Sequence, residues 1–424
     1  MASLALAAAA LTFVGKSFAQ APPPPLKKLE YDPKLKADRF AAGGVEGLLK
    51  ANGADVPIKD QPKFDAYFQK FVLPPLAMPD RDLPAVRSEI RRNFRMAGSG
   101  LAYDRLNQIV RDFMKFLINR PNSTPACRVN AILVLGDLNE FEGTGVKFSK
   151  PLPFALDDLI DILKDPKLPD YAKTTALVGV QRHAALSSTY PLAFESALEV
   201  GKLMVAMLGE KQVPKSRDPS GHVYVRRTAA EILGEIGEIG KTGAVVELVR
   251  DAMNEKDAPL SFRLGLCSAI GNFDYKKNPA AKIDYRSLEA AVCYAAIDAA
   301  EKEIARAAQL ELQAQKNEVV DPDRRRLSYI FKQLNLALAG ADVRNGRTGL
   351  ATAAAEAASP ATTSLGSKKA LAGSTLQQLD KPAFIASSEV VQAMLDSLQV
   401  GLPKRADAGK LPAEVAGKKA ESAK

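Results

Sequence analysis

One helical pattern recurs four times along the chain, and this repetition constrains the fold more than any other feature. The copies are CRVNAILVLGDL (127–138), AKTTALVGVQRH (172–183), VRRTAAEILGEI (225–236) and FRLGLCSAIGNF (262–273). Aligned copies agree at four positions. These hold a basic residue (Arg128, Lys173, Arg226, Arg263), then an apolar residue (Ala131, Ala176, Ala229, Leu266), then an aliphatic residue (Leu135, Val180, Leu233, Ile270), and directly after it glycine in three copies and glutamine in one (Gly136, Gln181, Gly234, Gly271).

The spacing of these positions predicts helices that pack closely on other helices. Offsets of three and four residues place side chains on one helical face, and small residues on that face let a neighbouring helix approach. The copies recur at intervals of 45, 53 and 37 residues. Each copy is preceded by another amphipathic segment, so the repeating unit is a pair of helices of about 40 residues.

This pattern resembles the HEAT-repeat family of armadillo-type proteins. A basic residue, two variable positions, alanine, and then an aliphatic residue followed by glycine is similar to the second helix of a HEAT repeat. The resemblance covers residues 101–273 well and the rest of 59–340 only through helical periodicity, within a predicted helical-repeat domain at 59–343. It implies antiparallel helix pairs stacked as an α-solenoid. The unequal intervals, and Gln181 in place of glycine, imply an irregular and compact stack.

The composition agrees with an all-α fold. Aromatic residues make up 6% of the chain and tryptophan is absent, whereas sheets favour aromatic and β-branched residues. Alanine and leucine, which favour helices, are abundant. Beyond the fourth copy, residues 285–316 are expected to form a long helix. Asp321 is expected to cap one further helix that closes the stack.

The N-terminal residues are expected to lie outside the folded domain. Residues 1–19 contain an apolar run followed by Ser17 and Ala19, which suit a small-x-small cleavage site, and they are typical of a signal peptide. No lysine or arginine precedes the run, so a misassigned start or an amphipathic anchor are the alternatives. Residues 20–58 are predicted to form a Pro-rich, charged linker. The mature protein is therefore expected in the periplasm, the cell envelope or the extracellular space.

The C-terminal residues 344–424 are rich in Ala, Ser, Thr, Gly and Lys, with too little large apolar area to offset the entropy of ordering. They are predicted to form a mostly disordered tail. The exception is a short helix at 388–399 that either docks on the stack or binds a partner. Its apolar side consists of Val391, Met394, Leu395 and Leu398. No segment of the mature chain is long and apolar enough to span a bilayer.

The sequence contains no pattern that indicates a catalytic group, a cofactor or a metal site. Of the two histidines, His183 falls in a packing position and His222 in a loop before a helix, and neither has zinc ligands at the usual spacing. The three cysteines form no CxxC pair, and Cys127 and Cys267 fall in packing positions. We expect a non-enzymatic protein. A pocket between helices with convergent titratable groups is the alternative that would support catalysis.

Basic residues provide the candidate binding site. The formal charge is +9, but it is spread along the chain and lacks the stacking aromatics of single-strand binders, so no specific nucleic acid is expected. Two arginine clusters stand out: Arg87, Arg91, Arg92 and Arg95, and Arg324, Arg325 and Arg326. Guanidinium groups suit carboxylate or phosphate partners. A merely solvated charged face is the alternative interpretation.

These observations lead to two functional hypotheses. The first is an exported, non-enzymatic scaffold that binds a protein of unknown identity through the surface of its helical repeats. The second is an envelope-associated protein whose arginine and lysine clusters hold anionic polymers or the lipid headgroups of a membrane surface. Binding that weakens strongly with salt would favour the second hypothesis.

Overall fold

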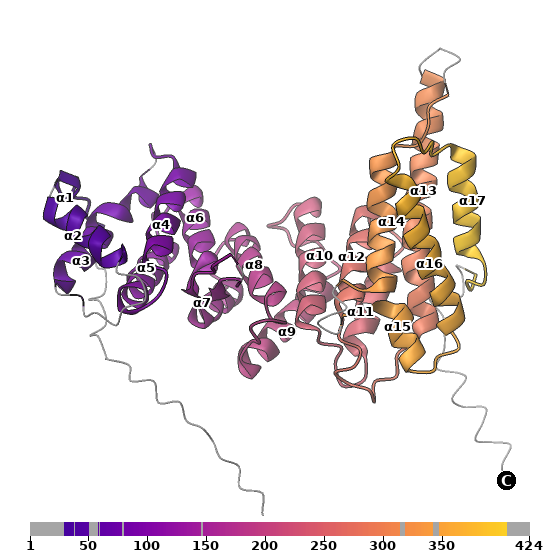
Figure 1. Cartoon of the computed structure of the whole chain (residues 1–424), viewed down its shortest axis with the longest axis horizontal. Coiled ribbons are helices and arrows are strands. Elements are labelled where there is room, and N and C mark those ends of the chain that lie inside the picture. Colours follow the sequence, from indigo (N-terminus) through magenta and orange to yellow (C-terminus); the bar gives the residue numbers. More distant parts are fainter. Residues whose placement is uncertain are drawn as a thin grey trace, which may run out of the picture. The chain divides into compact units, whose positions relative to one another are not determined.

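A computed structural model of the chain describes residues 29–37, 39–50, 58, 60–78, 80–145, 147–313, 319–341 and 347–404 (Figure 1). The all-α prediction is confirmed, because the described residues form helices packed against each other. The predicted signal peptide (1–19) lies outside the described residues. Two compact units can be distinguished, and each is described by itself. Their boundary falls at residues 134–150, inside the single domain predicted for 59–343.

The first unit comprises the described residues up to Val134 and Leu138–Ser149. Its elements are α1 (Lys34–Ala37), α2 (Arg39–Lys50), α3 (Gln61–Tyr67), a π-helical turn (Phe68–Val72), a 3-10 turn (Pro74–Ala77), α4 (Leu83–Ala97), α5 (Leu101–Asn119), most of α6 (Pro125–Asp137) and the short strand β1 (Asn139–Phe141).

The prediction of a linker over 20–58 is wrong where α1 and α2 form. Val45 and Leu49, one helical turn apart, are buried, and α2 packs on α3 and α4. Two large apolar side chains on one face are enough to dock a short amphipathic helix onto a neighbouring surface. The linker was predicted from the proline and charged residues of 20–58, which outnumber the two apolar residues Val45 and Leu49.

The second unit comprises Leu135–Asp137 and the described residues from Lys150 on. It begins with the short strand β2 (Lys150–Pro151). Its helices are α7 (Pro153–Lys164), α8 (Asp170–Ala185), α9 (Phe194–Gly209), α10 (Pro219–Ile236), α11 (Ala244–Met253), α12 (Leu260–Asn272), α13 (Tyr285–Gln313), α14 (Arg324–Ala339), α15 (Gly349–Glu356), α16 (Thr362–Leu379) and α17 (Ser388–Gln399).

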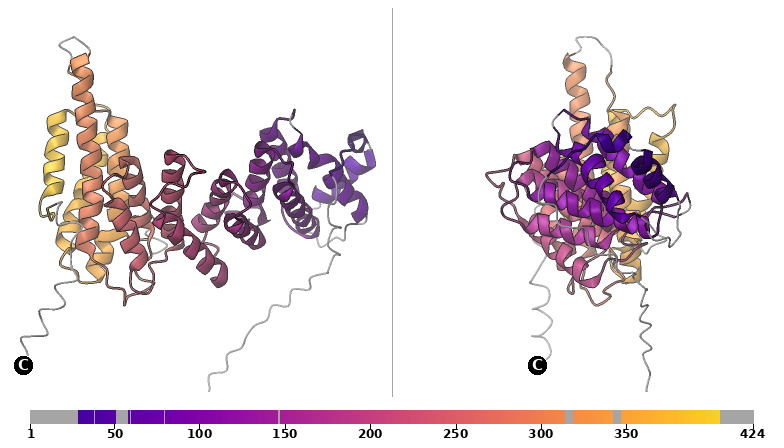
Figure 2. Two further views of the ribbon diagram at one scale, coloured as in Figure 1. Left: turned by 180° about the vertical axis from the view of Figure 1, so that it is seen from behind. Right: turned by 90° about the vertical axis from the view of Figure 1, so that its left-hand side faces the viewer.

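Helices α7–α14 and α16 of the second unit form two layers (Figure 1, Figure 2). In one layer α8 packs on α10, α10 on α12, α12 on α14, and α14 on α16. In the other, α7, α9, α11 and α13 follow one another, and each also packs on the helix that comes next in sequence. Three copies of the repeated pattern, in α8, α10 and α12, are therefore direct neighbours. A HEAT-like solenoid as the underlying architecture stays a prediction.

The glycine position of the pattern is the point where successive helices touch. A methyl group added at Gly234 in α10 would lie 2.7 Å from the carbonyl oxygen of Ala269 in α12. One added at Gly271 in α12 would overlap the carbonyl oxygen of Leu336 in α14. Glycine is required at both positions because the two backbones approach too closely for any side chain.

The copy without glycine makes a different contact. In α8, the side-chain amide of Gln181 donates a hydrogen bond to Glu231 of α10, with a donor–acceptor distance of 3.0 Å. The close approach of α8 occurs instead at Gly179, against residues Leu135–Asp137 of the same unit. A methyl group added at Gly136, in the last turn of α6, would lie 2.9 Å from the Cα of Gly179. Where the pattern has Gln181 in place of glycine, a hydrogen bond between side chains therefore links α8 and α10.

The basic position of the pattern ties each helix to the end of the helix before it. In three copies the arginine Nε donates to a backbone carbonyl in the last turn of that helix: Arg128 to Ile118 (2.9 Å), Arg226 to Leu208 (2.9 Å) and Arg263 to Met253 (2.7 Å). Carbonyls in the last turn have no partner within their own helix, and a positive charge is favourable there. Lys173, in the remaining copy, has no guanidinium group.

Helix α13 agrees with the predicted long helix, but the predicted cap of the next helix is wrong. The N-cap of α14 is Asp323, whose side chain accepts hydrogen bonds from the backbone N–H groups of Arg325 (2.8 Å) and Arg326 (3.3 Å). The backbone N–H of Asp323 donates to Glu303 of α13 at 2.8 Å. This contact fixes Asp323 just outside the helix, so α14 starts later than Asp321 would place it.

The prediction of disorder over 344–424 is wrong where α15 and α16 form. Leu350 and Leu365 are fully buried, as is Ala372, and α15 and α16 pack on α14 and on each other. Alanine and glycine bury little area each, but they allow helices to approach closely. The small apolar area of the segment indicated disorder, but close packing of small residues orders it. Residues 405–424 lie outside the described residues.

Helix α17 has the predicted bounds and docks within its own chain. It packs on α13 and α16 through Val391, Leu395 and Leu398. An ion pair joins the same elements: Lys368 Nζ of α16 lies 2.8 Å from Glu289 Oε1 of α13 and donates to the carbonyl of Val400 at 3.0 Å. Lys368 and Glu289 are almost fully buried, so their pairing compensates two desolvated charges.

The cysteines and histidines lie in the core. Cys127 and Cys267 are buried free thiols, as predicted, and burial raises the pKa of Cys267 to about 12. His183 is buried as well. His222 was expected in a loop, but it lies in the first turn of α10 with its Nε2 2.8 Å from the carbonyl oxygen of Glu210.

Replacing Gly271 with alanine tests the close contact between α12 and α14. The new methyl group would overlap the Leu336 carbonyl, so Gly271→Ala should lower the free energy of unfolding by about 1–3 kcal/mol or more. Gly366→Ala in α16 is the matched control, because nothing lies within 4 Å of its added methyl; it should raise that free energy by about 0.5–1 kcal/mol. Equal effects of the two substitutions in urea titrations would contradict the packing.

The buried imidazole of His183 predicts a pH dependence of stability. Burial, together with the charge of Arg182, lowers the pKa of His183 to about 3. Below about pH 6.5 the imidazole is protonated in the unfolded chain but stays neutral in the folded chain. The free energy of unfolding is therefore at its full value above this pH and decreases below it. From pH 7.5 to 5, the wild type should lose about 2 kcal/mol more than His183→Gln. Urea titrations measure these losses. If wild type and His183→Gln lose the same free energy of unfolding, the imidazole is hydrated in the folded chain and the prediction is contradicted.

Candidate functional site

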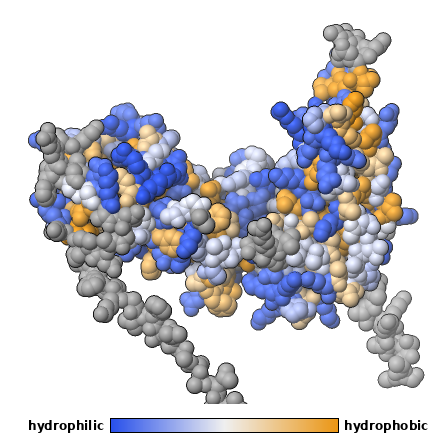
Figure 3. Space-filling model, viewed as in Figure 1, coloured by the Kyte–Doolittle hydropathy of each residue, from blue (hydrophilic) through white to orange (hydrophobic). Residues whose placement is uncertain are grey.

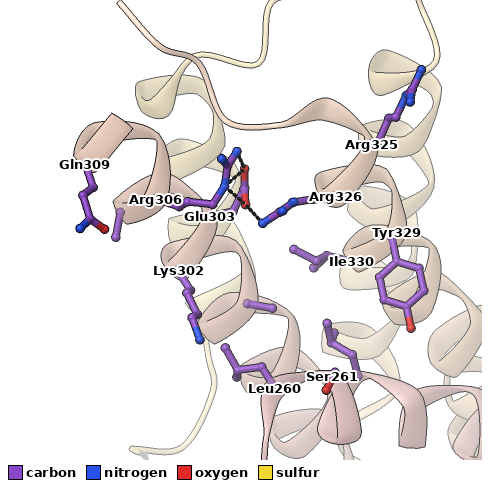
Figure 4. A pocket seen from close by; sticks show the side chains of 13 residues that line it. Leu260, Ser261, Lys302, Glu303, Arg306, Gln309, Arg325, Arg326, Tyr329 and Ile330 are labelled. Atoms are coloured by element: carbon purple, nitrogen blue, oxygen red, sulfur yellow. Dashed lines mark hydrogen bonds and ion pairs between the residues drawn. The ribbon is translucent and has the colours of Figure 1, made fainter. Parts of the chain in front are cut away.

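A groove in the second unit lies between the start of α12, the C-terminal half of α13 and the first turns of α14. Its volume is about 660 Å³. The apolar part of its lining consists of Leu260, Leu264, Ala299, Ala305 and Ile330. The polar part consists of Ser261, Lys302, Glu303, Arg306, Gln309, Arg325, Arg326 and Tyr329. The groove thus combines an apolar floor with a mainly basic rim (Figure 4).

The centre of the polar part is a buried carboxylate. Glu303 of α13 is 4% exposed. Its oxygens accept hydrogen bonds from Arg306 Nε at 3.0 and 2.9 Å, from Arg326 Nη1 at 3.3 Å and from the backbone N–H of Asp323 at 2.8 Å. Figure 4 shows Arg326 reaching from α14 toward Glu303. Glu303 therefore holds α13 and α14 together at one end of the groove.

This environment favours the ionised form of Glu303. Burial raises the pKa of its carboxyl, but the hydrogen bonds from Arg306 and Asp323 and the charges of Arg306 and Arg326 outweigh burial, so the net pKa is lowered. A carboxylate that stays charged and accepts this many hydrogen bonds is a poor general base. Its role is to position the two arginines.

The rest of the rim presents hydrogen-bond donors. Within the described part of the chain, the side chains of Lys302 and Arg325 have no partner, and Tyr329 is 44% exposed with its hydroxyl unbonded. The Arg326 side chain is 59% exposed, and among the described residues its guanidinium donates only through Nη1. Lysine and arginine have no acceptor atoms. The rim is therefore suited to a ligand that supplies acceptors.

The predicted cluster Arg324–Arg326 is partly used inside the protein. Arg324 Nη1 donates to the carbonyl of Pro382 at 3.4 Å. Arg326 joins the Glu303 network, whereas Arg325 points away from it in Figure 4. Figure 3 shows hydrophilic surface over the upper part of α14, beside apolar surface of α13. Arg325, and the part of the Arg326 guanidinium that does not bind Glu303, therefore remain available at the groove.

The predicted cluster on α4 belongs to the first unit. Arg91, Arg92 and Arg95 are exposed, and Arg92 pairs with Glu89 at 2.7 Å. Arg87 is half-buried, and its Nε has no hydrogen-bond partner among the described residues. None of the four lines the groove between α12, α13 and α14. They form a basic helix surface.

Sequence reasoning missed Glu303, Arg306, Lys302 and Tyr329. Glu303 and Arg306 are three residues apart in a helix rich in Ala, Glu, Lys and Arg, where such pairs are common on solvated faces. Only the neighbouring α14 turns this pair into part of a site. The nearest signal in the sequence is the position of Tyr329 within one helical turn of Arg325 and Arg326.

Comparisons with protein families, curated proteins and solved structures find no match to this chain. Among the described residues, no group of three or more His, Cys, Asp or Glu side chains is arranged to hold a metal ion. No helix in the described ranges is long and apolar enough to cross a membrane.

Replacing Glu303 with glutamine tests its role in joining α13 and α14. An amide cannot accept hydrogen bonds from two guanidinium groups and a backbone N–H as a carboxylate does, so Glu303→Gln should lower the free energy of unfolding by about 1–3 kcal/mol at pH 7. Because the pKa of Glu303 is lowered by folding, this contribution is present above about pH 4.5 and is lost as the pH falls through the folded-state pKa.

Urea titrations at pH 7 and pH 3 measure this effect. The difference between wild type and Glu303→Gln should shrink at the lower pH. Glu311→Gln, on the same helix outside the groove, is the control and should change stability by less than about 0.5 kcal/mol. A difference that persists unchanged at pH 3 would contradict the proposed ion-pair role.

Proposed function

We propose that this chain is a non-enzymatic binding protein that holds a segment of another protein in the groove between α12, α13 and α14. The observation that supports this most is the groove itself, which has a volume of about 660 Å³, an apolar floor and hydrogen-bond donors along its border. This volume is in the usual range of binding pockets. A segment of a few residues would bury this apolar surface.

The repeated pattern supports a scaffold built from helix pairs. The arginine contacts to preceding helices and the glycine contacts to following helices recur from one pair to the next. This is the kind of repeated unit that a HEAT-like solenoid requires, and such scaffolds generally present their surface to other proteins.

Export is part of the proposal. It is supported by the apolar run and the small residues within 1–19, which are typical of a signal peptide. The protein would then act in the periplasm, the cell envelope or the extracellular space.

A second candidate function is supported by a separate observation in the first unit. Arg91, Arg92 and Arg95 are exposed on α4, where they suit phosphates of an anionic polymer or of lipid headgroups. In this case vesicles with anionic headgroups should bind the protein, and binding should weaken strongly as salt rises. Removal of the α4 arginines, with the groove intact, should abolish it.

Photo-cross-linking tests the groove as a binding site. Tyr329 is replaced by p-benzoylphenylalanine in the source cells, and adducts are identified by mass spectrometry after irradiation. We expect one discrete protein adduct, because Tyr329 is half exposed at the rim. Ala305→Trp, which places a large ring over the apolar lining, should remove the adduct.

The same photoreactive residue at Lys241, an exposed position outside the groove, is the matched control. An adduct of equal yield from Lys241, or one that survives Ala305→Trp, would show that capture does not depend on the groove. The absence of any adduct from Tyr329 would count against the proposal as well.

A further inference from the structure

Resting on the proposed function, we infer that the segment held in the groove is an amphipathic helix with acidic residues on both sides of its apolar stripe. The inference comes from where the rim places its charges. Lys302 and Arg306 come from α13, whereas Arg325, Arg326 and Tyr329 come from α14. The apolar residues Leu260 and Leu264 of α12 complete the lining.

The layout of the groove is therefore a strip of apolar surface between two donor-bearing walls. Figure 4 shows Lys302 and Tyr329 on opposite sides, with Leu260 and Ser261 below and between them. An amphipathic helix that lies in such a groove presents apolar residues at spacings of three and four to the floor. The residues that flank this stripe then face the two walls.

The charge balance of the rim favours carboxylates at these flanking positions. The groove is lined by four cations, Lys302, Arg306, Arg325 and Arg326, and one anion, Glu303. The carboxylate of Glu303 is saturated by Arg306, Arg326 and the backbone of Asp323. Asp323 is itself occupied by two N–H groups of α14. An excess of positive charge remains, and no acidic group of the lining is free to offset it.

The chemistry of the donors points in the same direction. Lys302 and Arg325 can only donate hydrogen bonds, and the Tyr329 hydroxyl can donate one. An ionised carboxylate only accepts, so glutamate or aspartate side chains satisfy the rim without leaving an unpaired donor. A basic segment would meet like charges on both walls, which disfavours it.

A protein segment fits this layout better than a lipid does. A lipid carries its charge at one end and its apolar chains at the other, whereas this groove has donors along both sides of an apolar strip. An acidic amphipathic helix repeats both features along its length. Anionic vesicles therefore serve as the competing ligand in the test.

The test uses two synthetic helical peptides of the same length, labelled with fluorescein. Both carry leucine at positions i, i+3, i+4 and i+7. One has glutamate at the flanking positions and the other has glutamine. Fluorescence anisotropy with the full chain should show the glutamate peptide binding about five- to tenfold more tightly at low salt, because several exposed ion pairs contribute. This advantage should fall several-fold at about 0.3 M salt.

Charge reversal identifies the residues responsible. Lys302→Glu combined with Arg325→Glu removes one cation from each wall and should abolish the preference for the glutamate peptide. Lys215→Glu combined with Lys241→Glu changes the net charge equally at exposed positions outside the groove, and should leave the preference intact. Circular dichroism confirms that both variants keep their helical content.

The outcomes separate this inference from the proposed function. If both peptides bind equally and Ala305→Trp removes both, the groove binds protein segments but does not select acidic ones, and only the inference is overturned. If neither peptide binds, while anionic vesicles bind and Ala305→Trp removes that binding, both proposals are wrong. Loss of preference in the control variant would also overturn the inference, because net charge alone would then explain binding.

Discussion

The structure of the second unit depends on direct backbone contact between successive helices. Gly234 touches α12 and Gly271 touches α14 at places where even a methyl group would clash. Such contacts fix the distance between helix axes more strictly than larger side chains do, because backbones cannot adjust as rotamers can. The placement of α12 and α14, and with it the floor and one wall of the groove, follows from this constraint.

The arginine of the repeated pattern connects the two layers of helices. Glycine contacts set the helices of one layer side by side, and Arg226 and Arg263 attach the other layer by binding the carbonyl ends of α9 and α11. Both arginines are also paired with carboxylates, Glu255 and Asp298. Their charges are therefore compensated where they leave water. A single sequence pattern thus specifies contacts in two directions.

These physical roles explain which parts of the structure could be predicted from the sequence. The repeated positions were readable because helical spacing and residue size are local properties, and the apolar stripe of α17 was readable for the same reason. The fold of α15 and α16 was not readable, because close packing of alanines depends on a partner surface that one segment does not reveal. Asp323 was missed as the cap because Glu303, twenty residues away, selects it.

The candidate site also has a part that could be predicted from the sequence and a part that could not. Arg325 and Arg326 could be found as a cluster, since three adjacent arginines are visible in any sequence. Their function could not, because it depends on Glu303 and Arg306 on another helix. The groove exists only where α12, α13 and α14 meet, so its apolar lining belongs to no single segment.

Native-state amide hydrogen exchange can show whether the backbone contacts join successive helices into one cooperative unit. If backbone contacts join α10, α12 and α14 into one unit, their slowest amides should share a single opening free energy and the same dependence on urea, as expected for one cooperative unit. We expect Leu233, Ala269 and Leu336 to exchange together in this way. Separate opening free energies for the three helices, with α14 exchanging while α10 stays protected, would contradict it.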